Sequence, residues 1–256
     1  MNEPAPTVET RHENRLMSLE RVQRTFGALN ALDDVSFDIL RGEILGVAGP
    51  NGAGKTTLLN VCTGALPVTS GTIFFDGHRI DGLAPYRRCQ MGIARTFQIP
   101  QIFSSMSVRD NVALGAEFGQ GHRAQGDFDS HVSEVLEITG LSSRADASVS
   151  AADLITRKRI MLAAALATRP RLIFLDEPMS GLNHDEVESF VQLFRDLHAA
   201  LDLTLVIVEH KIRALAALSQ RILILHFGSV LTVDTPERVL ADPAVIDVYL
   251  GTQNLA

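Results

Sequence analysis

Residues 43–57 read EILGVAGPNGAGKTT. Residues 43–49 form an apolar run typical of a buried strand, and the glycines that follow interrupt any regular element. A helical pattern begins near Lys55. Between that strand and that helix, residues 49–56 match the pattern G-x-x-x-x-G-K-[ST], which requires this context. The stretch therefore predicts a phosphate-binding loop, called the phosphate loop below, in an α/β protein.

The residue types of the phosphate loop suit a nucleoside triphosphate. Glycines let backbone N–H groups surround phosphate oxygens, and the start of a helix favours negative charge. Lys55 would reach the β- and γ-phosphates, the hydroxyl of Thr56 would bind Mg²⁺, and Thr57 would add a phosphate contact. The alternative is a glycine-rich turn with an exposed lysine, which the flanking strand and helix disfavour. The predicted binding residues are Gly49, Pro50, Asn51, Gly52, Ala53, Gly54, Lys55, Thr56 and Thr57.

A second apolar strand, RLIFLDEP at residues 171–178, ends in two acids. The carboxyl ends of strands in a parallel sheet are where ligands gather. Asp176 would hold Mg²⁺ through water, and Glu177 would orient or deprotonate a water that attacks the γ-phosphate. Taken alone, two solvated acids at a strand end is an equally good interpretation. The phosphate loop favours the catalytic one.

The remaining pattern organises the chain around these two strands. Short apolar runs between Leu19 and Ile39, broken at Gly27, Asn30 and Asp33/Asp34, and a hairpin-like segment at 70–77 predict a β-rich N-terminal subdomain. Alternating strands and helices from Arg171 onward predict a parallel sheet. A helical lobe is expected over about 99–170, with a flexible connection at Gly119, Gly121 and Gly126. Helices are predicted near 107–118, 129–139, 156–168, 185–200 and 212–219, and further strands at 204–210 and 221–227.

Composition narrows the function classes. The chain has 256 residues, 46% of them hydrophobic, and a net charge of −7 without a long basic run, so we expect no nucleic-acid partner. It lacks an apolar stretch of about 18 residues and an apolar signal core, so we expect neither a membrane span nor export. Two cysteines without metal-ligand spacing fit a reducing cytoplasm. Residues 1–15 have the composition of a disordered tail.

With GPNGAGKTT and LDEP in place, the chain resembles ATP-binding cassette (ABC) proteins over nearly its whole length after the tail. Four further elements follow in that family's order. Phe26 resembles the aromatic that stacks on adenine, and Gln98 resembles the glutamine that joins the catalytic site to the helical lobe. SGLN at 180–183 resembles the D-loop, and His210 resembles the switch histidine.

The resemblance implies a P-loop ABC ATPase fold over residues 16–251, with 252–256 as a C-terminal tail. It implies ATP and Mg²⁺ as ligands, with Gln98 joining Thr56 and Asp176 at the metal. The catalytic residues would be Glu177, His210 and Lys55. Taken singly, Phe26 is a core residue, Gln98 a surface polar residue and His210 an ordinary strand-end histidine; their order in the chain favours the family roles.

Within the family, SGLN, the strand end VEHK and DPAVIDVYLG at 242–251 resemble ATPases of branched-chain amino acid importers. That resemblance implies a peripheral subunit on the cytoplasmic face of the membrane. Two ATPase subunits would lie beneath two membrane-spanning permease subunits, which receive solute from an external binding protein. Branched-chain amino acids or related small solutes would be the cargo. Ile99, Ile102, Phe103 and Met106 suit either a docking groove for a membrane subunit or core burial.

The chain departs from the family at its signature, Leu-Ser-x-Gly-Gln. Residues 152–156 read ADLIT. A different alignment cannot restore the motif, because the sequence has no glycine between Gly140 and Gly181 and no glutamine between Gln125 and Gln192. In the family two subunits close head to tail, and each signature covers the ATP bound by the other subunit. Asp153 would place a carboxylate, and Ile155 a branched side chain, beside the partner's γ-phosphate. Arg157, Lys158 and Arg159 form either a solvated helix face or an electrostatic compensation.

Three functions follow from these features. We predict an asymmetric heterodimer of two ABC ATPases, in which this chain's Glu177 performs most of the turnover. A regulatory cassette that binds ATP and hydrolyses it poorly is the alternative that the lost signature favours. A soluble cassette ATPase of translation or DNA repair would carry two cassettes or a long coiled-coil insertion, and the sequence has neither.

Overall fold

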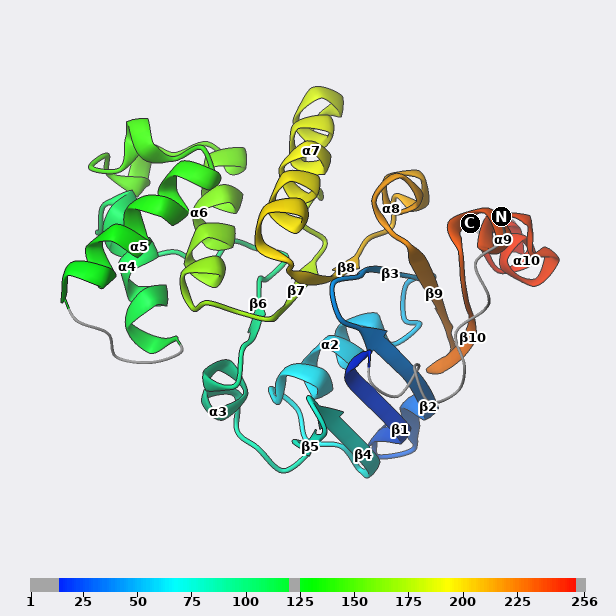
Figure 1. The fold of residues 1–256 in the computed structure, drawn as a ribbon. Coiled ribbons are helices and arrows are strands. Elements are labelled where there is room, and N and C mark those ends of the chain that lie inside the picture. The colour runs from blue at the N-terminus through cyan, green and yellow to red at the C-terminus, as the bar shows by residue number, and fades with distance from the viewer. Residues whose placement is uncertain (1–13, 120–124, 252–256) are drawn as a thin grey trace, which may run out of the picture.

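The computed structural model describes residues 14–119 and 125–251, and contains two sheets and a group of helices beside them (Figure 1). The smaller sheet is antiparallel, with strand order β2-β1-β4-β5. Its strands are β1 (Arg15–Phe26), β2 (Leu29–Leu40), β4 (Ser70–Phe75) and β5 (His78–Arg79). They confirm the β-rich N-terminal subdomain and the expected hairpin-like segment.

The larger sheet has six strands in the order β10-β9-β3-β8-β7-β6. Neighbouring strands from β9 to β6 run parallel, and β10 pairs antiparallel with β9. Every residue of β3, β7 and β8 is buried, as expected for central strands covered on both faces. The strands are β3 (Ile44–Ala48), β6 (Ile93–Arg95), β7 (Leu172–Asp176), β8 (Thr204–Val208), β9 (Arg221–His226) and β10 (Ser229–Asp234). The predicted α/β class is confirmed.

Helices α4, α5 and α6 pack against one another and form the helical lobe, drawn in green in Figure 1. The expected helices are confirmed with boundaries shifted by a few residues. Across the described residues no helix combines the length and the apolar character that a membrane span requires. The helices are α2 (Lys55–Thr63), α3 (Pro85–Gln90), α4 (Val108–Phe118), α5 (Gln125–Ile138), η1 (Ser142–Arg144), η2 (Val149–Ala151), α6 (Leu154–Ala167), α7 (His184–Leu201), α8 (Ile212–Leu218), α9 (Pro236–Ala241) and α10 (Pro243–Gly251).

Some local expectations were wrong. Asn30 and Asp33/Asp34 do not break the N-terminal segment, because β2 continues through them. The pairing of β1 with β2 continues past these residues with shifts of register, and Asp34 adopts a positive φ of 50°. Gly126 lies inside α5 rather than in a connection. Arg15, which the tail prediction included, starts β1. Residues 1–13, Gly121 and 252–256 lie outside the described residues.

A buried arginine fixes the far end of α2, the helix that follows the phosphate loop. Arg88 of α3 is 1% exposed, and its Nη1 donates to the carbonyl oxygens of Val61 (2.7 Å) and Cys62 (2.8 Å) at the end of α2. Its Nε donates to the carbonyl oxygen of Leu83, and its Nη2 donates to that of Asp81. The guanidinium thus adds charged donors to two carbonyl groups in the last turn of α2, of which that of Val61 also accepts from the backbone N–H of Gly64.

We expect Arg88→Leu to lower the free energy of unfolding by about 2–4 kcal/mol, because buried carbonyl groups lose charged donors. Urea denaturation of the full chain measures the change. The exposed neighbour Arg87, whose guanidinium donates to Gln90 at 3.3 Å and lies 5.2 Å from the ring centroid of Tyr86, is the matched control. Arg87→Leu should change stability by less than about 0.5 kcal/mol, and equal losses for the two variants would contradict this role.

Candidate functional site

The phosphate loop leaves the buried strand β3 and enters α2 through backbone conformations that suit glycine. Gly49 has a φ of 151°, and a Cβ there would collide with the carbonyl oxygen of Leu225 in β9. Gly54 has a φ of 103°, and a Cβ there would lie 2.5 Å from the carbonyl oxygen of Ala31 in β2. The loop therefore needs glycine at both positions, for conformation and for space.

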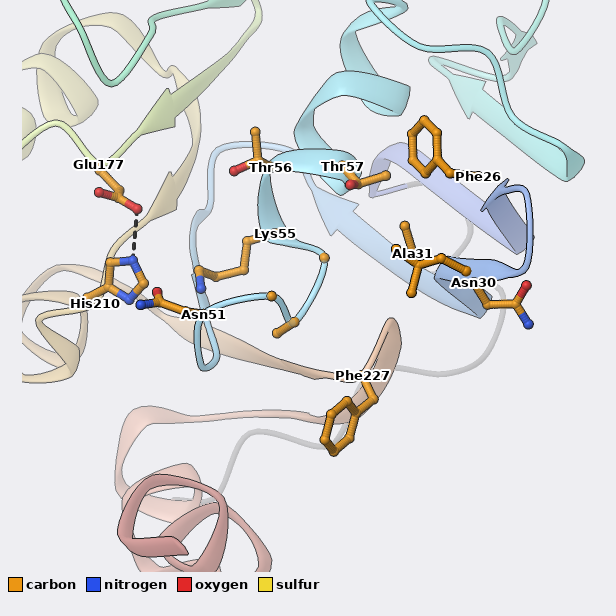
Figure 2. A pocket seen from close by; sticks show the side chains of 14 residues that line it. Phe26, Asn30, Ala31, Asn51, Lys55, Thr56, Thr57, Glu177, His210 and Phe227 are labelled. Carbon is orange, nitrogen blue, oxygen red and sulfur yellow. Dashed lines mark hydrogen bonds and ion pairs between the residues drawn. The ribbon is translucent and has the colours of Figure 1, made fainter. Parts of the chain in front are cut away.

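A cavity of about 420 Å³ opens over this loop (Figure 2). Most of the predicted binding residues line it, together with two of the predicted catalytic residues outside the loop. Gly49, Pro50, Gln98 and Asp176 adjoin the lining. The lining residues are Phe26, Leu29, Asn30, Ala31, Asn51, Gly52, Ala53, Gly54, Lys55, Thr56, Thr57, Glu177, His210 and Phe227.

Lys55 is held inside its own loop. Its side chain is buried, and Nζ donates hydrogen bonds to the carbonyl oxygens of Gly49 (2.7 Å) and Pro50 (2.9 Å). Burial lowers the pKa of the ammonium group, and the carboxylates of Glu177 and Asp176 oppose this shift. An anion in the cavity would give the partly desolvated charge a much stronger partner than neutral carbonyls provide.

Glu177 is the meeting point of three segments. It follows β7 with a φ of 45°, and His210, which follows β8, donates from Nε2 to its Oε1 at 2.8 Å (Figure 2). Gln98, which follows β6, donates from Nε2 to Oε2 at 2.7 Å. The structure thus brings together three residues that lie far apart in the sequence, and fixes both carboxylate oxygens at the edge of the cavity.

Asp176, the last residue of β7, is 6% exposed. Burial raises the pKa of its carboxyl group, whereas Arg95, whose Nη2 lies 3.6 Å from Oδ2, lowers it. In the described residues, no three His, Cys, Asp or Glu side chains cluster as a metal site. Mg²⁺ commonly takes one or two protein oxygens and completes its shell with phosphate oxygens and water, so Asp176 and Thr56 would be enough to hold it here.

Two aromatic side chains border the cavity. Phe26, at the end of β1, is 43% exposed, so it is not a core residue, and the Arg24 guanidinium stacks 4.4 Å from its ring centroid. Phe227, in the turn between β9 and β10, is 82% exposed. Sequence reasoning missed Phe227, as it missed Leu29, Asn30 and Ala31. A lone aromatic residue in a hairpin turn carries no signal that links it to a distant phosphate loop.

The residues at the signature position begin α6. Asp153 is the N-cap, and its Oδ1 accepts from the backbone N–H of Thr156 at 2.8 Å. Hydrogen bonds from Thr156 lower the pKa of the Asp153 carboxyl group, which therefore stays ionised at neutral pH. Ile155 packs against the core. A carboxylate and a branched side chain thus stand where the family's motif has serine and glycine.

The solvated helix face expected at Arg157, Lys158 and Arg159 was wrong. Lys158 is 3% exposed, because this side of α6 packs against the α/β core. Arg157 donates to the carbonyl oxygens of Ser150 and Ala152. Arg159 donates to Thr139 and Ser189, which connects α5 with α7.

The apolar side chains after Gln98 were expected either to form a docking groove for a membrane subunit or to be buried in the core, and the structure shows some of each. Ile99 and Phe103 are 72% and 60% exposed. Ile102 and Met106 are partly buried, and Ile102 packs against the core. Ile99 and Phe103 therefore remain available to a partner.

Comparisons with known proteins agree with this architecture. A family model described as ABC transporter matches residues 32–180, and one described as branched-chain amino acid ATP-binding cassette transporter matches residues 229–253. The chain is 32% identical over 249 residues to the high-affinity branched-chain amino acid transport ATP-binding protein LivG of Escherichia coli strain K12. That alignment covers 92% of this chain and 98% of LivG.

The chain is also similar to an ATP-binding protein named for another solute and to a solved structure. The chain is 35% identical over 243 residues to the Fe(3+) ions import ATP-binding protein FbpC of Streptomyces coelicolor, covering 94% of this chain and 68% of FbpC. The ADP conformation of MJ1267, an ATP-binding cassette of an ABC transporter, superposes with a TM-score of 0.84 at 26% identity, over 93% of this chain and 99% of that one. By its motifs, its fold and these matches, the chain belongs to the ABC transporter family, whose ATP-binding cassettes are ATPases coupled to transport.

Proposed function

We propose that this chain binds ATP with Mg²⁺ and hydrolyses the ATP to ADP and phosphate, driving solute import through membrane-spanning partner subunits. The observation that carries the proposal is the position of Glu177, held by Gln98 and His210 at the edge of the cavity that Lys55 and Thr56 also line. A carboxylate fixed by two donors beside a phosphate loop suits a general base.

In this proposal each residue has a separate task. The amino group of Lys55 exchanges the carbonyl oxygens of Gly49 and Pro50 for phosphate oxygens. Glu177 orients a water and accepts its proton as the water oxygen attacks the γ-phosphorus, while the β–γ bridge oxygen leaves with ADP. Mg²⁺, when bound with Thr56 and Asp176, supplies positive charge beside the phosphates. With ATP bound, the ring of His210 would donate a hydrogen bond to the γ-phosphate.

Phe26 is the proposed platform for adenine. Its exposed ring borders the same cavity as the phosphate loop, so one nucleotide can contact both. The guanidinium of Arg24 covers part of the ring, and a base would stack on the remaining surface.

The membrane partner has a suitable surface close to Glu177. An apolar cavity of about 550 Å³ lies between the α/β core and α6, and Tyr86, Phe97 and Met161 are among its lining residues. Tyr86 is 61% exposed and Phe97 43% exposed. Because Gln98 follows Phe97 directly and contacts Glu177, a membrane subunit seated here would sense the catalytic carboxylate through Gln98.

Branched-chain amino acids or related small solutes are the proposed cargo, delivered by an external binding protein to permeases above this subunit on the cytoplasmic face of the membrane. The support is the match of residues 229–253 and the coverage of 98% of LivG. The chain is 35% identical to FbpC, which is named for the import of Fe(3+) ions, so identity of the cassette by itself does not assign the solute.

The altered signature points to an asymmetric pair of ATPases. In a head-to-tail pair, this chain's own ATP meets the partner's signature, whereas the partner's ATP meets Asp153 and Ile155. An ionised Asp153 repels phosphate at close range. We therefore propose a heterodimer with a homologue that carries an intact signature, in which Glu177 performs most of the turnover.

The first test removes the phosphate-loop charge. Lys55→Ala should weaken nucleotide binding roughly ten- to a hundredfold and bring ATP hydrolysis below detection, because a charged contact to the phosphates is lost. Titration calorimetry measures the binding and phosphate release measures the turnover. Unchanged affinity for ATP would contradict the proposed site.

The second test separates binding from hydrolysis. Glu177→Gln should keep the affinity for ATP and lower kcat by about 10²–10⁴-fold, since the amide keeps the shape but cannot accept the proton. The same calorimetric and phosphate assays apply. Turnover at the wild-type rate would remove Glu177 from the proposed mechanism.

The third test restores the signature. Residual hydrolysis in a complex that carries Glu177→Gln comes from the partner's site, which faces residues 152–156. Asp153→Ser with Ile155→Gly should raise this residual rate roughly tenfold for each phosphate hydrogen bond regained. Serine remains a good N-cap for α6, whereas Asp153→Ala with Ile155→Gly serves as the control without the hydroxyl. Fast hydrolysis by a homodimer of this chain alone would contradict the asymmetric model.

A further inference from the structure

Lys158 makes a buried contact with the backbone of the proposed catalytic residue. It lies in α6, two residues beyond the altered signature, and its side chain is 3% exposed. Its Nζ lies 3.3 Å from the carbonyl oxygen of Glu177, to which it donates. The same carbonyl oxygen accepts from the backbone N–H of Ser180 at 3.1 Å, which closes a turn over residues 177–180. Residues 177–181 are called the catalytic turn below.

The catalytic turn holds Glu177 in a conformation that needs support. A φ of 45° is unfavourable for a residue with a Cβ. The backbone N–H of Glu177 donates to the carbonyl oxygen of Val208 at 3.0 Å. The backbone N–H of Met179 donates to Oε1 of Glu209, a carboxylate that is 2% exposed, at 2.7 Å. Lys158 and Glu209 therefore support the turn through two different backbone groups.

Nearby carboxylates partly balance the charge of Lys158. Burial lowers the pKa of its ammonium group, and the carboxylates of Glu209 and Glu177 oppose that shift. Burial likewise raises the pKa of Glu209. A simpler role for Lys158 therefore exists: it could serve only as a counter-ion for Glu209. Any test has to separate that role from an effect on Glu177.

We propose that Lys158 is a positioning residue, which fixes the direction of the Glu177 carboxylate and makes it depend on the placement of α6. This inference rests on the proposed function, in which Glu177 is the base. Leu154, at the start of α6, lies close to Gly181, because a Cβ added there would be 3.0 Å from its Cδ2. The helix thus lies beside both ends of the catalytic turn.

Through this contact, the position of the helical lobe affects the direction of the proposed catalytic base within the same chain. When α6 moves away from the α/β core, the ammonium group leaves the Glu177 carbonyl and the turn loses a charged hydrogen bond. When α6 returns, the carboxylate regains its direction between Gln98 and His210. A cassette without the usual signature thus still couples its helical lobe to its own site.

The experiment compares Lys158→Met, Glu209→Gln and the double variant in the full chain, co-expressed with its partner subunits. Methionine keeps much of the side-chain volume without the charge, and glutamine keeps the oxygen that Met179 contacts. Arg159→Met, on the neighbouring residue of α6, is the control, because its contacts lie with α5 and α7. The readouts are kcat, KM for ATP and hydrogen exchange of residues 177–183.

We expect Lys158→Met to lower kcat about tenfold or more, leave KM within about twofold, and speed hydrogen exchange of the catalytic turn. The double variant should stay slow, because restoring charge balance does not restore the contact to Glu177. Arg159→Met should keep kcat and the exchange of residues 177–183.

Recovery of kcat and slow exchange in the double variant would overturn the inference, since Lys158 would then be only the counter-ion of Glu209. Unchanged kcat and exchange in Lys158→Met would overturn it as well. A wild-type complex that does not hydrolyse ATP would instead refute the proposed function. In that case hydrogen exchange still decides whether Lys158 holds the turn.

Discussion

The arrangement of the site depends on a tight backbone packing around the phosphate loop. Gly49 touches the carbonyl oxygen of Leu225 in β9, and Gly54 approaches the carbonyl oxygen of Ala31 in β2. The backbone N–H of Gly228 donates to the carbonyl oxygen of Ala53 at 3.0 Å. Both sheets therefore meet at this loop. Side chains at their ends, including Phe26 and Phe227, reach one cavity for this reason.

The parallel strand order of the larger sheet brings the proposed catalytic residues together. Strands β6, β7 and β8 are neighbours, so the residues that follow them emerge at one edge. Gln98, Glu177 and His210 are joined there by hydrogen bonds of 2.7 and 2.8 Å. The helical lobe contacts this edge through Lys158. In the proposed mechanism, the strands hold the carboxylate that accepts the proton, and the helices of the lobe adjust its direction.

The sequence predicted the fold class, the helical lobe and most of the residues that line the cavity over the phosphate loop, because that loop and the LDEP strand are local patterns with a defined chemistry. It did not predict that Lys158 is buried, since a basic run at a helix start usually faces solvent. Phe227 was also missed, because only the tertiary packing of its hairpin turn brings it to the loop. Asn30 and Asp33 were misjudged as turns because long-range strand pairing overrode their local preference.

The central claim is that the ATP held by this chain's phosphate loop is the one that is hydrolysed. The most direct test is vanadate trapping in the assembled transporter, with a photoreactive ATP analogue radiolabelled on its α-phosphate. Light then attaches the trapped nucleotide to the subunit that hydrolysed it. The account predicts vanadate-dependent labelling of this chain as the ADP form. Vanadate-dependent labelling confined to the partner ATPase would contradict it.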